Sequence, residues 1–189
     1  NMVLAIIKLV HQVNTIKLKS GVIAVLNKII PKELYIIEFN IKQREYYTFW
    51  YTDDTDGFLL ENNEKLKSFA SEKEAKRFAE DNKFKLDKEI LLISSDILIN
   101  LNLEEFDCNL VLTYWNIMSD IAQSVHSQFL GDSKDDEVQS IYNKLFYGCN
   151  LPALKKDGED YLPKWNEIEK KWIVKVIENG FELLLKALT

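Results

Sequence analysis

Strand-like and helix-like patterns occupy different halves of this 189-residue chain, and this separation most constrains its fold. From residue 34, ELYIIEFNI and EYYTFWYT are rich in β-branched and aromatic residues, which is typical of strands. Beyond residue 102, apolar residues recur every three or four positions, which is typical of helices. We therefore predict an α+β fold, with a small antiparallel sheet and a helix followed by an antiparallel helical bundle.

Turn and cap residues add detail to the strand-rich half. DDTDG, between EYYTFWYT and FLLE, predicts a hairpin with a short loop. A calcium loop does not fit this acidic stretch, because Asn63 stands where a bidentate carboxylate is needed. Ser71 and Glu74 have capping-box spacing and predict a helix over EKEAKRFAEDN. EILLISSDILI predicts a further strand.

Three helices are expected in the second half, over residues 102–131, 133–147 and 166–188. The first is predicted to begin at the capping-box-like pair Asn102 and Glu105 and to stop at Gly131. Acidic residues open the second helix, where they suit the helix dipole. These patterns are those of helices that pack against one another.

The chain is divided into three parts by these patterns. Residues 1–33 are an uncertain N-terminal segment, because MVLAIIKLVHQV is compatible with a helix and TIKLKSGVIAVL with a hairpin. Residues 34–101 form the expected α+β subdomain and residues 102–189 the expected helical subdomain. We expect these two subdomains to form one compact unit.

A polar stripe without lysine or glutamate runs along the first long helix. Its members are Asn109, Thr113, Asn116, Asp120, Ser124 and Ser127. A solvated face would usually carry Lys and Glu, so we expect this helix to be packed on several sides and to hydrogen-bond its neighbours. The alternative is a binding surface. The expected hydrogen-bond partner is the connection over residues 149–165.

That connection, CNLPALKKDGEDYLPKW, is long and partly apolar. We expect its apolar side chains to pack onto the helices and KKDGED to form an exposed tip. The apolar side chains in question are Leu151, Leu154, Tyr161 and Trp165.

Composition excludes several functional classes. The net charge of −6 argues against a protein that binds nucleic acid directly. Two cysteines and two histidines without ligand spacing argue against a zinc site, and reduced thiols suit a cytoplasmic protein. No apolar run reaches the roughly 18 residues of a membrane span. No GxSxG, HExxH, P-loop or GxGxxG pattern occurs, so we expect neither an enzyme nor a cofactor.

The segments TYWNIMSDIAQSV, FLG and IYNKLFYGCNLPALKKDGEDYLPKW resemble the C-terminal half of certain bacterial immunity proteins. These are the cognate inhibitors of polymorphic toxins, including toxins of contact-dependent growth inhibition systems. The order of the first half, a hairpin ending in DGFL and then a capped helix rich in Glu, Lys and Ala, is common among small immunity proteins too. The resemblance therefore covers roughly residues 34–188. It implies a non-enzymatic cytoplasmic protein that binds one toxin domain and blocks it. The alternative is a non-catalytic regulatory or scaffold module that binds a host protein.

An acidic inhibitor suits the basic cleft of a nuclease toxin, so we expect aromatic anchors within an acidic rim. For each aromatic residue the alternative is packing in the core. The candidate anchors are Trp50, Tyr51, Tyr147 and Tyr161. The candidate rim residues are Asp53, Asp54, Asp56, Asp157, Glu159 and Asp160.

Overall fold

The computed structural model describes residues 33–52, 55–61, 64–99, 101–152 and 160–189. Residues 1–32, for which a helix and a hairpin were predicted, lie outside the described residues. The strands are β1 (Leu34–Ile41), β2 (Arg44–Tyr51), β3 (Gly57–Phe58), β4 (Ser68–Phe69) and β5 (Leu86–Ser94). The helices are α2 (Glu72–Asp81), α3 (Ser95–Ile99), α4 (Cys108–Ser124), the 3-10 helix η1 (Leu130–Asp132), α5 (Asp136–Gly148) and α6 (Glu167–Leu188).

Two successive hairpins build most of the sheet. β1 and β2 pair antiparallel, and the two residues between them, Lys42 and Gln43, both have positive φ angles of 50° and 65°. Such a two-residue turn matches the twist of the flanking strands. β2 then pairs antiparallel with β3, which confirms the hairpin predicted around the acidic stretch.

β5 makes the sheet mixed, because it lies parallel to β1. The strand order is β3-β2-β1-β5, with β4 pairing with β2. An all-antiparallel sheet was therefore a wrong prediction for β5, since the chain crosses over through α2 and enters the sheet again in the direction of β1. The predicted strand EILLISSDILI ends at Ser94, where α3 begins. Within the described residues β5 pairs only with β1, so its other edge is an outer edge of the sheet.

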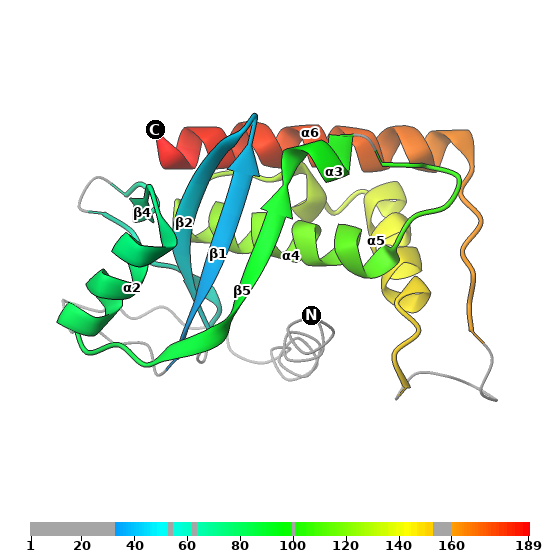
Figure 1. The fold of residues 1–189 in the computed structure, drawn as a ribbon. Coiled ribbons are helices and arrows are strands. Elements are labelled where there is room, and N and C mark those ends of the chain that lie inside the picture. The colour runs from blue at the N-terminus through cyan, green and yellow to red at the C-terminus, as the bar shows by residue number, and fades with distance from the viewer. Residues whose placement is uncertain (1–32, 53–54, 62–63, 100, 153–159) are drawn as a thin grey trace.

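Both faces of the sheet are covered. Ile36 and Phe49 pack against α2, which Ser71 caps as predicted by accepting a hydrogen bond from the backbone of its third residue. Ile37 and Phe39 belong to the core shared with the helices α4, α5 and α6. In Figure 1, α4 runs behind the strands and α6 along the top of the view. Successive residues of β1 are thus buried on opposite faces, which explains its continuous apolar sequence.

The first long helix is shorter than predicted at both ends. It begins after Asp107, whose side chain accepts a hydrogen bond from the Asn109 backbone at 2.8 Å, whereas Asn102 caps only a local turn. It ends at Ser124, and the positive φ of 51° at His126 turns the chain away. The predicted stop, Gly131, instead lies in η1 against the Trp115 side chain.

The two later helices are confirmed. Asn166 and Glu169 form a complete capping box at the start of α6. α4 packs against both α5 and α6. One large hydrophobic cluster contains Phe39 and Trp50 from the first half of the chain and Val111 and Ile177 from the second. The two predicted subdomains therefore share one core. None of the helices in the described parts of the chain combines the length and apolarity needed to cross a bilayer.

Candidate functional site

The polar stripe on α4 forms part of the internal packing. The Trp50 indole N–H donates to Asp120 Oδ2 at 2.8 Å, and the Tyr142 hydroxyl donates to Asn116 Oδ1 at 2.9 Å. Ser124 Oγ accepts a hydrogen bond from the Phe58 backbone N–H at 2.9 Å. The expectation of a packed helix is confirmed for these three members. For these three members the predicted partner was wrong, because their bonds join α4 to β2, β3 and α5 and not to the connection 149–165.

The first group of candidate binding residues is buried to different degrees. Trp50 is fully buried and hydrogen-bonded, so the core alternative holds for this residue. Tyr51 is half-buried, and burial together with Asp120 and Asp56 raises the pKa of its hydroxyl. Asp56 is half-buried too. The remaining acids of this turn, at positions 53 and 54, lie outside the described residues.

The second group of candidates comes together where α5 ends and the chain returns toward α6. Tyr147 is 58% exposed, Tyr161 45% and Leu162 79%. Asn150 holds the two chain segments together: its side-chain N–H donates to the Tyr161 carbonyl at 3.0 Å, and its Oδ1 accepts from the Tyr161 N–H at 2.6 Å. Asp160 is exposed beside them. We call these five residues the α5–α6 end. The candidates at positions 157 and 159 lie outside the described residues.

The connection itself packs only in part. Leu151 is buried, and Trp165 stacks on Phe106 with ring centroids 5.3 Å apart, as expected. The expectation was wrong for Tyr161, whose backbone binds Asn150 but whose side chain stays partly exposed. Position 154 lies outside the described residues. Figure 1 shows the returning segment as an extended chain beside α5.

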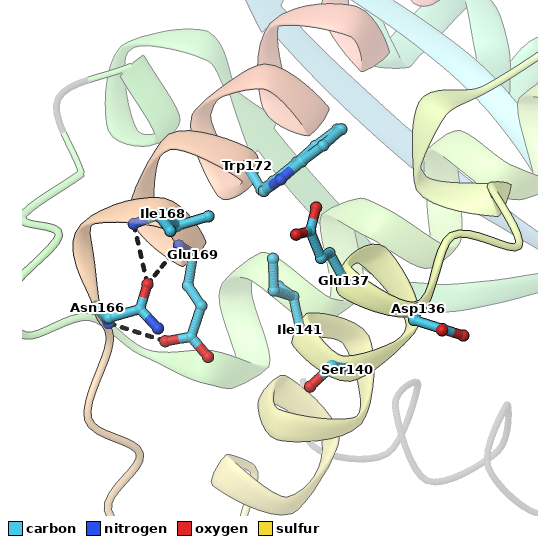
Figure 2. Close-up of a pocket in the computed structure, with 8 residues that line it drawn as sticks. All are labelled: Asp136, Glu137, Ser140, Ile141, Asn166, Ile168, Glu169 and Trp172. Carbon is cyan, nitrogen blue, oxygen red and sulfur yellow. Dashed lines mark hydrogen bonds between the residues drawn. The ribbon is translucent and has the colours of Figure 1, made fainter.

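A pocket of about 330 Å³ lies between the first turns of α5 and α6 (Figure 2). We call it the α5–α6 pocket. Its apolar walls come from Ile141, Ile168 and Trp172, and its polar lining from Asp136, Glu137, Ser140, Asn166 and Glu169. Sequence reasoning missed this pocket. The acidic first turn of α5 was attributed to the helix dipole, and Trp172 to the apolar face of α6.

The carboxylates of the pocket differ in their partners. Glu169 pairs with Lys144 at 2.8 Å and also accepts a hydrogen bond from the Asn166 backbone. Asp136 and Glu137 form no ion pair with any residue that the structure describes. Lys144 is thereby neutralised, whereas the acidic first turn of α5 keeps its negative charge.

Both cysteines are buried. Burial raises the pKa of the Cys108 thiol to about 11 and that of the Cys149 thiol to about 12, so both stay protonated at neutral pH. Among the described residues, no three His, Cys, Asp or Glu side chains are grouped so that they could share a metal ion.

Comparison with known proteins shows a likeness of fold. No protein-family model matches the chain, and no curated protein matches its sequence. The crystal structure of the SatS C-terminal domain in complex with bromine is similar, with a TM-score of 0.50 over 82% of this chain and 92% of that chain. The two sequences are 15% identical. At this identity the likeness concerns the fold alone.

Proposed function

We propose that the chain is an immunity protein that binds a cognate bacterial toxin in the cytoplasm and neutralises it by stoichiometric occlusion. The observation that carries this proposal is the α5–α6 end, where two chain segments joined by Asn150 each expose a tyrosine, and one of them also a leucine, on an acidic protein. The resemblance of this part of the sequence to immunity proteins supports the same conclusion.

Exposed aromatic and aliphatic side chains are what a protein interface uses as anchors. Tyrosine in particular is enriched among the residues that contribute most to binding. Asn150 fixes the backbone of Tyr161 relative to the end of α5, so less conformational entropy is lost when a partner binds. The α5–α6 end therefore has the composition and the order of a binding surface.

Charge supports a basic partner. The protein carries a net charge of −6, and an acidic protein is steered toward a basic surface by long-range attraction. A nuclease toxin, whose cleft must attract phosphate groups, has such a surface. We therefore propose a nuclease domain as the partner and its basic cleft as the occluded region.

Co-expression with the toxin-like product of the adjacent upstream gene tests this function. We expect a one-to-one complex on purification and loss of toxicity in cells. A Tyr147→Ala, Tyr161→Ala double variant is expected neither to form this complex nor to protect cells from the toxin. Ile99→Ala is the matched control, because Ile99 is an exposed apolar residue on α3. If the two proteins do not associate with each other, the proposal is contradicted. Capture of a host protein instead would favour the regulatory or scaffold alternative.

A further inference from the structure

We infer that the α5–α6 pocket binds an arginine side chain of a protein partner, with the guanidinium group between Glu137 and Trp172. The inference rests on the proposed function only for the source of the arginine, which is the toxin. The chemistry of the pocket itself depends on the described residues alone.

The shape of the pocket fits a single long side chain. Its volume of about 330 Å³ lies at the lower end of the range of ligand sites, ~300–1,000 Å³. Ile141 is buried at its base, Trp172 is half-buried in its wall, and Ile168 is exposed at its rim. These three side chains give an apolar lining for the methylene groups of an arginine.

Glu137 is the carboxylate placed to receive a cation. In Figure 2 its side chain extends between Ile141 and Trp172, with the carboxylate toward the Trp172 ring, whereas the Asp136 carboxylate points away. Glu169 is occupied by Lys144. No residue in the described ranges pairs with Glu137, so an incoming cation would displace no existing ion pair there.

The Trp172 ring favours the same ligand. Lys175 Nζ lies 4.8 Å from the ring centroid, so this ring already attracts one cation. Lys175 is also the positive charge that opposes a second cation nearby. A planar guanidinium can stack on an indole and donate two hydrogen bonds to one carboxylate, whereas an ammonium group is a point charge. Glu137 and Asp136 disfavour an anionic ligand, and an apolar ligand would desolvate Glu137 without compensation.

The test needs no toxin. The uniformly ¹⁵N-labelled full chain is titrated with N-acetyl-arginine amide, and the indole N–H resonance of Trp172 is followed by NMR after assignment with Trp172→Phe. N-acetyl-citrulline amide has nearly the same shape without the charge and is the matched control ligand. We expect a saturable shift with the arginine compound and no saturable shift with the citrulline compound.

Two variants with opposite expected effects complete the test. Glu137→Gln should weaken arginine binding by up to about 5-fold, the range of a partly exposed ion pair. Lys175→Gln should strengthen it, because a competing cation is removed. Equal responses to arginine and citrulline, or a Glu137→Gln variant that binds as the wild type does, would overturn the inference.

The proposed function can fail separately from this inference. If arginine binds in this pattern and no toxin is captured, the pocket stands and the immunity role falls. If the toxin is captured but arginine amide does not bind, the toxin uses another part of the surface and the inference falls.

Discussion

The buried face of α4 and the α5–α6 end both combine polar and aromatic side chains, but the aromatic side chains are buried in the first region and exposed in the second. On α4, Asn116 and Asp120 each accept a hydrogen bond from an aromatic side chain. At the α5–α6 end, Tyr147 and Tyr161 are exposed, and the Asn150 side chain binds backbone atoms of Gly148 and Tyr161. The aromatic rings are therefore structural in the first region and available to a partner in the second.

The difference follows from position in the fold. α4 lies between the sheet and the other helices, so a polar group there must find a protein partner or lose the energy of its hydrogen bonds to water. The α5–α6 end lies at the border of the helical layer, where water satisfies polar groups. Similar residue types thus take different roles because of what surrounds them.

Replacement of Trp50 should have the largest effect. Trp50→Ala removes a fully buried ring and is expected to lower the free energy of unfolding by about 3–5 kcal/mol in urea titrations. Trp172→Ala, at the half-buried pocket, is the matched control and should lose less. Equal losses in the two variants would contradict the distinction between the regions.

Removal of the Trp50 partner should have the next largest effect. Asp120→Ala leaves a buried indole N–H without its acceptor, which we expect to cost about 1–3 kcal/mol of stability. A double-mutant cycle with Trp50→Phe isolates this bond, and a coupling energy near zero would argue against it. Glu137→Ala is the control at the α5–α6 pocket, where we expect a change within about 0.5 kcal/mol.

Tyr147→Ala reverses this order of effects. Because Tyr147 is mostly exposed, its replacement should change the free energy of unfolding by no more than about 0.5 kcal/mol. The same change should weaken toxin binding about tenfold, or about 1.4 kcal/mol, in a calorimetric titration. A variant that unfolds more easily but binds normally would show that this ring is structural.

The buried thiols should leave stability independent of pH near neutrality and should lower it progressively in alkali. The pKa values of Cys108 and Cys149 are raised from about 9 to about 11 and about 12, mainly by burial. Because the pKa of each thiol is higher in the folded state than in the unfolded state, its contribution to the free energy of unfolding is fully present below about pH 9. This contribution is lost as the pH rises toward about 12.

Urea midpoints measured from neutral to alkaline pH check this. A Cys108→Ala, Cys149→Ala variant should lose less stability over the alkaline range than the wild type. Iodoacetamide offers a second readout, since it should alkylate these thiols far more slowly in the folded protein than in urea. Equal alkylation rates in the two states would contradict their burial.

Much of the fold could be predicted because local patterns agree with it. Strands β1 and β2, the capped helix α2 and the capping box of α6 all carry their own sequence signals. The parallel pairing of β5 could not be predicted, because strand direction depends on the path of the crossover. The early end of α4 could not be predicted, because the residue with positive φ that follows it is His126 and not a glycine.

The candidate site was predictable only in part. Tyr147 and Tyr161 were expected to be aromatic anchors, and they do lie at one end of the molecule, although whether they bind a partner stays a prediction. Trp50 was misplaced because a strand residue with an aromatic ring reads the same whether it faces the core or a partner. The α5–α6 pocket arises from two helices that are distant in sequence, so no local pattern indicates it.

The outer edge of β5 has a consequence for solubility. Within the described chain this edge offers unpaired peptide groups, which can act as a template for a strand of another molecule and so promote aggregation. Lys88 and Glu89 are exposed in the first half of β5, and charged side chains discourage such pairing. Leu92, in the second half, is exposed and apolar. We therefore expect edge-to-edge association of two copies to involve the carboxyl half of β5 more than the amino half, because the strand residues from Ile90 to Ser94 are uncharged.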